Sequence, residues 1–319
     1  MKISPYMDIN RIEFMVTFQC SAHCKHCSVG DRLNRSDGVK HVSASRAAEV
    51  VEELSQIFCV SSVMTFGGEP LLYTDVVCAI HEAANHCGID ARQVITNGYF
   101  TKDNEQRKQA AELLMRAGVN NLLLSVDVFH QETVPLEAVY HFAQSVKDAG
   151  IPNIKLHPAW VVDEQHENPY NDKTKEIIAA FADLSLPVST GNNIFMAGNA
   201  VLHLAHYYDK PNLNLSDSCG SMPYTEPLTE LTSLSINPNG DVVVCGFIIG
   251  NIHKQGIPEI IAQYDPYQNE WMNAILTGGV GKLLELSKKK GIDVDYSQCY
   301  SVCDVCHKVN SKLTKNISI

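Results

Sequence analysis

The chain has 319 residues, 45% of them hydrophobic, and its 25 Lys and Arg residues against 36 Asp and Glu residues give a formal net charge of −11. This acidity argues against a nucleic-acid-binding protein, because such proteins need a positively charged surface. The sequence contains neither an apolar run of about 20 residues nor a signal peptide at its N-terminus, so we expect a cytoplasmic protein that does not interact with membranes.

Strand and helix patterns alternate through the first two thirds of the chain. The periodicity predicts strands at residues 12–18, 62–66, 92–96, 120–127, 153–162 and 186–191, and helices at residues 43–58, 74–87, 101–118, 135–150 and 173–184. Such alternation indicates the α/β class, with a parallel sheet covered by helices. We therefore expect a partial (β/α)6 TIM-type barrel over residues 1–205.

A second, smaller domain is expected over residues 206–319. The alternation stops near residue 205, where Pro, Asn and Ser become frequent. The run 231–247 predicts a β-hairpin, because its Asn-Gly pair favours a tight turn. A helical stretch follows over about residues 258–290.

The chain has 11 cysteines, and a reducing cytoplasm makes structural disulfides between them improbable. Eight of the cysteines gather in two groups at opposite ends of the sequence. The first group is Cys20, Cys24 and Cys27, and the second is Cys219, Cys245, Cys299, Cys303 and Cys306. This placement predicts two metal centres.

The first group follows the first predicted strand, where a barrel places its active site. Three thiolates without a fourth local ligand suit a four-iron cluster with one open iron; the alternative is a structural zinc site with a distant fourth ligand. The spacing C-x3-C-x2-C resembles that of the radical S-adenosylmethionine (SAM) enzymes. The resemblance implies a [4Fe-4S] cluster on Cys20, Cys24 and Cys27 whose open iron binds SAM and whose electron cleaves it to a 5′-deoxyadenosyl radical. His26 stands where the family usually has an aromatic residue.

Further motifs at the ends of successive strands strengthen this resemblance and imply SAM contacts. In "TFGGEP", Gly67 and Gly68 would let the backbone approach the ligand closely, and Glu69 would face the SAM ammonium group. Asn97 in "ITNG" and Ser125 in "LSVD" would lie near the ribose or the methionine carboxylate. Gly198 in "IFMAGNA" would approach the adenine, although Ala197 departs from the family pattern.

The C-terminal cysteines resemble the SPASM/twitch extension of radical SAM enzymes, which binds auxiliary iron–sulfur clusters. The order C…G-x4-C…C-x2-C implies one auxiliary cluster, expected to be [4Fe-4S], on Cys219, Cys245, Cys303 and Cys306. A structural zinc ribbon on the same residues is the alternative. Cys299 is left over, and three roles stay open: a replacement or additional cluster ligand, an inert thiol, or a hydrogen-atom donor to a substrate radical.

Polar residues at strand ends are candidates for positioning a substrate: Asp127, His130, and His157 with Trp160. Each also has a purely structural interpretation. The resemblance favours a ribosomally synthesised peptide as substrate, modified by epimerisation, cross-linking or thioether formation. The alternatives are a dehydrogenase or mutase acting on a small molecule such as a sugar or aminoglycoside, and, more remotely, a non-catalytic metal-binding scaffold.

Two protein partners are expected. One is an electron donor of the flavodoxin or ferredoxin type. Because only about ten residues precede the first predicted strand, we expect no fused leader-binding domain, and the other partner would be a separate leader-peptide-binding protein. The alternative is that the substrate docks directly on the barrel and the hairpin.

Overall fold

The computed structural model describes residues 3–34, 38–220 and 225–317. The chain divides into two compact units. The larger unit contains Asn10–Tyr208 and Ser235–Gly240, and the smaller contains Met1–Ile9, Asp209–Leu234 and Asp241–Ile319. The domain boundary expected at residue 205 stays a prediction.

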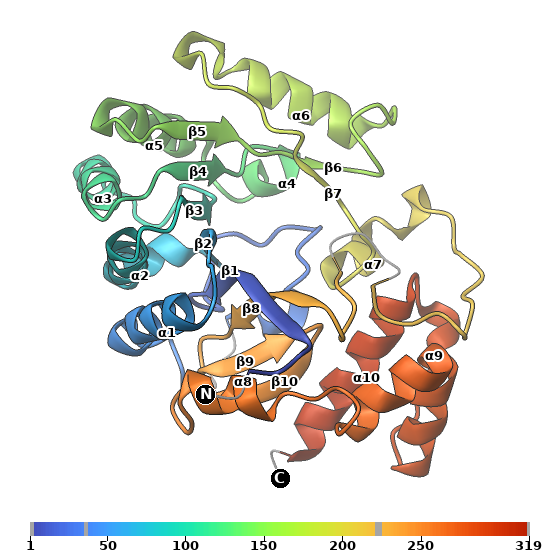
Figure 1. Ribbon diagram of the computed structural model, residues 1–319. Coiled ribbons are helices and arrows are strands. Elements are labelled where there is room, and N and C mark those ends of the chain that lie inside the picture. The colour runs from blue at the N-terminus through green and yellow to red at the C-terminus, as the bar shows by residue number, and fades with distance from the viewer. Residues whose placement is uncertain (1–2, 35–37, 221–224, 318–319) are drawn as a thin grey trace. The chain divides into compact units, whose positions relative to one another are not determined.

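The larger unit contains a parallel sheet with the strand order β1-β2-β3-β4-β5. These strands are β1 (Met7–Met15), β2 (Ser62–Phe66), β3 (Ala91–Thr96), β4 (Asn121–Leu124) and β5 (Asn153–Leu156). Four helices connect successive strands and lie along the outer face of the sheet (Figure 1): α1 (Ala44–Ile57), α2 (Thr74–His86), α3 (Asn104–Arg116) and α5 (Leu136–Ala149). The predicted α/β class and partial parallel barrel are confirmed.

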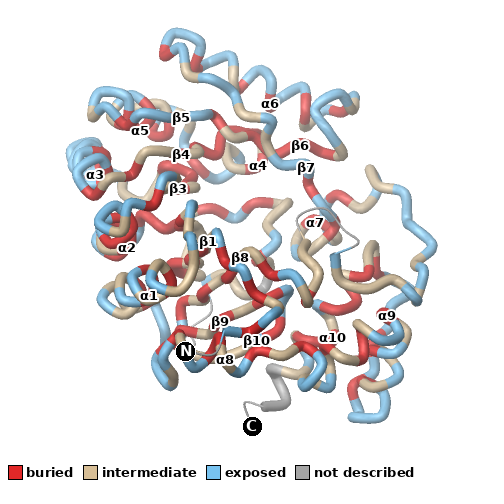
Figure 2. Tube along the Cα trace, viewed as in Figure 1, coloured by how far each residue is buried: buried red, intermediate tan, exposed pale blue. Residues whose placement is uncertain are grey.

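Local sequence explains where these helices begin and which face they bury. The side chain of Ser43 accepts a hydrogen bond from the amide of Arg46 and caps α1, and Asp103 caps α3 in the same way. Along α1 the buried residues are Ala47, Val50, Val51 and Leu54, a helical spacing that faces the sheet. Buried and exposed residues accordingly alternate along each of these helices in Figure 2.

The last predicted strands differ from the structure. The strand expected at 153–162 ends at Leu156, and β6 (Ala159–Trp160) follows after Pro158. The strand expected at 186–191 is wrong, because Val188 makes only an isolated bridge to Leu156, and β7 (Asn192–Asn193) pairs with β6 instead. Proline explains both differences, since Pro158 and Pro187 have no amide hydrogen for a strand ladder.

The remaining elements of the larger unit are short helices near the strand ends. They are α4 (Val128–Gln131), α6 (Pro169–Ala179) and α7 (Asn199–His203), with 3-10 turns η1 (Gly30–Arg32), η2 (Pro70–Tyr73), η3 (Ala182–Leu184) and η4 (Ala205–Tyr207). The helix predicted at 173–184 therefore starts earlier, at Pro169, because Asn168 caps it by accepting the amides of Tyr170 and Asn171.

The smaller unit combines antiparallel strands with helices. Its elements are β8 (Leu231–Ile236), β9 (Asp241–Val244), β10 (Phe247–Asn251), α8 (Ile257–Gln263), α9 (Glu270–Lys289), η5 (Tyr296–Gln298) and α10 (Val302–Ile317), and β8 ends within the larger unit. The helical stretch expected over about residues 258–290 consists of two helices, α8 and α9. The second is kinked at Gly279, whose φ is +66° and where a Cβ atom would lie 2.4 Å from the carbonyl carbon of Ser216.

The described helices were compared in length and apolar character with a membrane span, which needs about 20 apolar residues. None of them combines the length and the apolar character that crossing a bilayer requires.

Candidate functional site

The loop after β1, residues 16–34, is called the cysteine loop, and its three cysteines lie close enough to influence one another's pKa. Burial raises the pKa of Cys20 to about 12, and the charges of Glu69, Cys24 and Cys27 add to this rise. Burial also raises the pKa of Cys27, again with a contribution from Cys24. Three neighbouring thiolates repel one another, so a cationic metal centre is the partner that would hold all three deprotonated.

Backbone amides of the same loop point at these sulfur atoms. The amide of Ala22 donates to Sγ of Cys20 at 3.4 Å, and the amides of Val29 and Gly30 form hydrogen bonds that favour the Cys27 thiolate. Hydrogen bonds of this kind stabilise the thiolate ligands of iron–sulfur clusters. Among residues 3–34, 38–220 and 225–317, no three His, Cys, Asp or Glu side chains are arranged to hold a single metal ion. The all-thiol donor set and its amide environment fit an iron–sulfur cluster.

Residues 67–69, after β2, pack directly on the cysteine loop. The amide of Gly68 donates to the carbonyl of Thr17 at 2.7 Å, and the amide of Glu69 donates to that of Gln19 at 2.8 Å. A Cβ atom would lie 2.5 Å from the Thr17 oxygen at Gly67 and 2.1 Å from the Gln19 oxygen at Gly68. Only glycine allows this contact. The glycines therefore approach the cysteine loop, and their approach to a ligand stays a prediction.

Glu69 is fully buried, and its carboxylate accepts three hydrogen bonds. Its Oε1 accepts from the Thr96 hydroxyl at 2.7 Å and the Leu71 amide at 3.0 Å, and its Oε2 accepts from the Asn97 amide at 2.8 Å. Burial outweighs these bonds and raises the pKa of Glu69 to about 7. A cation placed beside it would favour the charged form, which is compatible with the predicted contact to the SAM ammonium.

The side chain of Asn97 joins the end of β3 to the cysteine loop. Its amide nitrogen lies 3.2 Å from Oγ of Ser21 and 3.7 Å from Sγ of Cys20. Ser125 is buried one strand further along, and its backbone amide donates to the carbonyl of Thr96 at 2.8 Å. The predicted contacts of Asn97 and Ser125 with SAM stay predictions.

Asp127 and His130 form an ion pair at the end of β4. Asp127 is fully buried and caps α4 by accepting the amide of His130 at 3.0 Å, and it also accepts the amide of Ala159 at 3.0 Å. Nδ1 of His130 lies 2.9 Å from each carboxylate oxygen. Burial opposes the charge of Asp127, but His130 lowers its pKa to about 2. Burial likewise opposes the charge of His130, but Asp127 and Cys24 raise its pKa well above the ordinary value.

His157 and Trp160 are held by hydrogen bonds within the barrel. Nδ1 of His157 lies 2.7 Å from Oγ of Ser189, and Nε2 lies 2.7 Å from the amide nitrogen of Asn192. Nε2 therefore accepts and Nδ1 carries the proton. Burial lowers the pKa of His157, which favours this neutral form. Trp160 is buried and donates to the carbonyl of Thr190 at 3.2 Å. Whether His157 positions a substrate stays a prediction.

The segment around Gly198 supports the cysteine loop from another side. Gly198 has a φ of +56°, and a Cβ atom there would lie 2.4 Å from the carbonyl oxygen of Cys27. The backbone amide of Asn199 donates to that same carbonyl at 3.0 Å, and its side-chain amide donates to the carbonyl of Cys24 at 3.2 Å. Sequence reasoning missed Asn199; its position directly after the predicted Gly198 was the available signal.

Four cysteines of the smaller unit gather from three separate segments. A hydrogen bond that the Cys219 thiol donates to Cys245 raises the pKa of Cys219, as do burial and the charges of Cys306 and Cys303. Burial raises the pKa of Cys303 to about 11 and that of Cys306 to about 12, with Cys245 contributing to both. The side-chain amide of Asn310 lies 3.8 Å from Sγ of Cys306. This four-thiol group fits an iron–sulfur cluster, and its ligand assignment stays a prediction.

Cys299 has different surroundings. Its side chain is buried, and Nζ of Lys308 lies 3.2 Å from its Sγ. Lys308 also lies 3.5 Å from the carboxylate of Asp304. Burial raises the pKa of Cys299, and Lys308 opposes this rise. The thiol is thus paired with an ammonium group.

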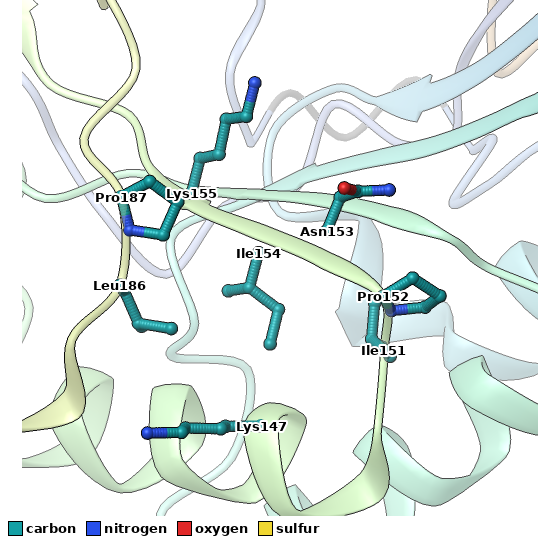
Figure 3. A pocket seen from close by; sticks show the side chains of 8 residues that line it. All are labelled: Lys147, Ile151, Pro152, Asn153, Ile154, Lys155, Leu186 and Pro187. Atoms are coloured by element: carbon teal, nitrogen blue, oxygen red, sulfur yellow. The ribbon is translucent and has the colours of Figure 1, made fainter.

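A cavity of about 230 Å³ lies at the start of β5, away from these side chains. It is bounded by residues 151–155, by Leu186 and Pro187, and by Lys147 of α5 (Figure 3). Lys147 donates to the carbonyl of Leu184 at 2.7 Å. The predicted site residues follow the other ends of the strands, so none of them lines this cavity.

Two protein-family models match the chain. Residues 14–199 match the model of the radical SAM superfamily. Residues 228–307 match the SPASM model, an iron–sulfur cluster-binding domain. The first match covers more than half of the chain, and the second covers most of the smaller unit.

Curated relatives share part of the sequence. The GTP 3′,8-cyclase of Limosilactobacillus fermentum is 28% identical over 121 residues, which cover 38% of this chain and 34% of that protein. The GTP 3′,8-cyclase of Desulforamulus reducens is 23% identical over 212 residues, which cover 61% of this chain and 62% of that protein. The chain therefore spans less than two thirds of the length of these relatives.

Solved structures show weaker likenesses. One described as native anSMEcpe with bound AdoMet has a TM-score of 0.49 and 12% identity, covering 98% of this chain and 100% of that one. HydG, a maturase of the [FeFe]-hydrogenase, has a TM-score of 0.43 and 11% identity, covering 99% and 83%. Likenesses of this strength support no conclusion about activity.

Proposed function

Because the chain belongs to the radical SAM superfamily and carries a SPASM domain, we propose that it modifies a ribosomally synthesised peptide by abstracting a hydrogen atom. Its cofactors are a [4Fe-4S] cluster, SAM and auxiliary iron–sulfur clusters. When bound, the cluster and SAM supply a 5′-deoxyadenosyl radical. Cys20, Cys24 and Cys27 would hold this cluster, and the thiols of Cys219, Cys245, Cys303 and Cys306 would hold the auxiliary one.

The chain's own contribution to SAM binding would come from the buried groups beside the cysteine loop. Oε2 of Glu69 accepts one hydrogen bond and keeps a lone pair for an ammonium group. Asn97 is fixed by its contacts with Ser21 and Cys20, so its amide is already oriented. Fixed polar groups of this kind lower the reorganisation needed when the reacting molecule binds.

A primary-carbon radical attacks many C–H bonds, so the site must exclude water and hold its substrate firmly. The side chains that follow β3 and β4 suit this need, because Asn97, Ser125 and Asp127 are all buried. The Asp127–His130 pair also gives the end of β4 a fixed shape. These residues would form the walls against which a substrate carbon is positioned.

The distribution of positively charged side chains favours a peptide substrate over a nucleoside triphosphate. The loops after β2, β4 and β5, which span residues 67–73, 125–135 and 157–168, contain no Arg or Lys. Triphosphate recognition relies on Arg and Lys side chains. The loop after β3 contains Lys102, and residues 35–43 contain Arg35 and Lys40. In the cysteine loop, Lys25 is paired with Glu132 at 2.6 Å, and Arg32 lies over the ring of Phe18. A substrate without a polyphosphate fits these walls better.

A small molecule is the second candidate, because the curated relatives named above are GTP 3′,8-cyclases. Such a substrate would have to bind through neutral donors, or through Lys25 after the Glu132 pair opens. A sugar or aminoglycoside places weaker demands on positive charge than GTP does.

Two partners are part of the proposal. Radical SAM enzymes take electrons from external reductants, and we expect a flavodoxin or a ferredoxin in this role. A separate protein that binds the leader of the precursor peptide would deliver the peptide substrate.

The deciding experiment uses the anaerobically reconstituted full chain with SAM and a strong reductant. It is incubated with the precursor peptide encoded beside its gene, with GTP, or alone. We expect 5′-deoxyadenosine together with a modified peptide, with uptake of a single deuterium from heavy water on epimerisation or loss of two hydrogens on cross-linking. Conversion of GTP and an unchanged peptide would establish the second candidate. A zinc-loaded protein that leaves SAM intact would contradict both and indicate a scaffold.

A further inference from the structure

The strands of the larger unit turn alternate residues to the two faces of the sheet. One row of residues points outward to the helices and is buried: Phe14, Thr65, Val94, Leu122 and Ile154. The residue after each of these points to the inner face, and the strand register aligns a second row there: Met15, Phe66, Ile95, Leu123 and Lys155. The first four residues of this inner row are half-buried, and Lys155 is exposed.

The inner row lies next to the side chains predicted to contact SAM or the substrate. Asn97, Ser125 and His157 follow β3, β4 and β5, each two residues beyond a member of the row and on the same face. Two residues of extended chain span about 7 Å. Ligand sites are lined mainly by apolar side chains, with a few polar groups that fix the orientation of the ligand. The inner row has this composition, and Lys155 is its single charged residue.

Lys155 differs from the other charged residues on the inner face of these strands. Arg11 and Glu13 of β1 neutralise each other, with Nε and Oε1 2.6 Å apart. In contrast, no side chain in residues 3–34, 38–220 and 225–317 forms an ion pair or a hydrogen bond with the ammonium group of Lys155. Figure 3 shows this side chain on the opposite side of β5 from Ile154 and α5. Its charge is therefore available to a ligand on the inner face.

An exposed lysine on the last strand of a sheet can also serve to prevent pairing with a further strand. At β5 another segment of the chain already occupies the edge. The amide of Leu156 donates to the carbonyl of Pro187 at 3.0 Å, and the amide of Ser189 donates to the carbonyl of Leu156 at 2.9 Å. A further strand is excluded beside Leu156 without any contribution from Lys155.

We propose that Lys155 is a specificity-determining residue that binds a carboxylate of the peptide substrate and holds it beside the apolar inner row. This inference rests on the proposed function and names the class of peptide: one with an acidic group next to an apolar side chain. The ammonium group of lysine is a compact charge that one carboxylate balances. A triphosphate would leave most of its charge uncompensated here, because Lys155 is the one unpaired cation on the inner face of the described strands.

The test is a double-mutant cycle between the reconstituted full chain and the precursor peptide encoded beside its gene. In the peptide, each Asp, each Glu and the C-terminal carboxylate is replaced in turn by the corresponding amide. In the chain, Lys155→Met removes the charge and Lys155→Arg keeps it. Lys173→Met is the matched control, because Lys173 is an exposed lysine of α6 that pairs with Glu176. Fluorescence anisotropy with SAM but without reductant gives the Kd of the peptide, and turnover gives its KM and kcat.

We expect Lys155→Met to raise the Kd and the KM of the peptide by about tenfold or more, because a charge-assisted hydrogen bond is lost. Lys155→Arg and Lys173→Met should bind the peptide like the native chain. One amide-substituted peptide should show the same loss with the native chain and no further loss with Lys155→Met. An unchanged Kd in Lys155→Met, or losses that add in full for every substituted peptide, overturns the inference.

The same measurements separate this inference from the proposed function. A peptide that the native chain modifies, with no coupling to Lys155, refutes only the role of Lys155. A peptide that is neither bound nor modified refutes both. If GTP is converted instead and its KM rises in Lys155→Met, Lys155 binds a phosphate and the proposed carboxylate is wrong.

Discussion

The two cysteine sites are built in opposite ways. At the N-terminal site, three thiols lie on one short loop whose backbone is fixed by other elements: Gly68 binds Thr17, Thr133 binds His23, and Asn199 binds Cys27. At the C-terminal site, four thiols come from three segments that are far apart in sequence, and Cys219 contacts Cys245 side chain to side chain. The first site is shaped by the barrel before any metal binds, whereas the second depends on distant segments meeting.

This difference predicts that single cysteine substitutions at the two sites have different effects on SAM cleavage. Alanine at Cys20, Cys24 or Cys27 should reduce SAM cleavage to the background rate, because a cluster lacking one of its three thiolates is lost. Alanine at Cys303 or Cys306 should leave SAM cleavage in place and lower the iron content by about four per chain. The measurements are iron analysis and 5′-deoxyadenosine release under a strong reductant.

Alanine at Cys59, which is exposed and outside both groups, is the control for cysteine removal in general. If Cys303→Ala abolished SAM cleavage as completely as Cys24→Ala, the two sites would not be independent and the comparison would fail.

The second prediction concerns the contact that fixes the N-terminal loop. In Gly68→Ala the new methyl group would lie 2.1 Å from the carbonyl oxygen of Gln19, so the backbone must move. We expect the free energy of unfolding of the iron-free chain to fall by about 3 kcal/mol. Gly88→Ala is the matched control, because Gly88 has a φ of +73° but no atom within 4 Å of the added methyl, and it should lose about 1 kcal/mol. Equal losses in denaturant unfolding would show that the contact with Gln19 is unimportant.

The sequence predicted the sheet well where local periodicity decides the structure. The strand expected at 62–66 coincides with β2, and the helices expected at 43–58 and 74–87 correspond to α1 and α2 within a few residues. The same reasoning failed at 186–191, where Pro187 prevents a ladder, and it missed α4, because four residues are too few to show a helical period.

The candidate site shows the same division between local and tertiary information. Glu69 and Asn97 follow from the resemblance of their motifs to those of the radical SAM family, whereas Asp127 follows from its position after a strand, because parallel strands end at one edge of a sheet. Their partners were not found: Thr96 for Glu69, Ser21 for Asn97, and Ala159 for Asp127 are set by how β3, the cysteine loop and β6 pack. Cys299 stayed ambiguous because spacing alone does not show that Lys308 faces its thiol.

A third prediction isolates the stability of the larger unit from both metal sites. His81 of α2 is fully buried beneath the sheet, with Nε2 2.9 Å from the Thr65 hydroxyl, and burial lowers its pKa to about 3. The unfolded chain binds this proton first as the pH falls below about 6.5, so stability is lost on acidification. The expected contribution is about 1.4 kcal/mol for each pH unit below that value.

Denaturant unfolding of iron-free His81→Gln across the range from about pH 7 to about pH 5 would measure this contribution as a difference from the native chain. His86→Gln, at an exposed position on the same helix, is the control. A difference that stays constant with pH would mean that His81 takes up its proton without unfolding.

The smallest effect on iron content and SAM cleavage is expected for Cys299→Ala, which tests whether Cys299 belongs to the C-terminal ligand set. Its sulfur lies 3.2 Å from the ammonium of Lys308, whereas the thiols that influence Cys219 are Cys245, Cys303 and Cys306. Cys299→Ala should therefore keep the iron content and SAM cleavage of the native chain. Deuterium uptake into a peptide product then distinguishes the remaining roles: its loss with 5′-deoxyadenosine release intact identifies a hydrogen-atom donor, and its retention identifies an inert thiol. A fall in iron content equal to that of Cys303→Ala would instead make Cys299 a cluster ligand and contradict the assignment of the four-thiol group. The Cys299 sulfur would then have to leave the ammonium group of Lys308 to bind iron.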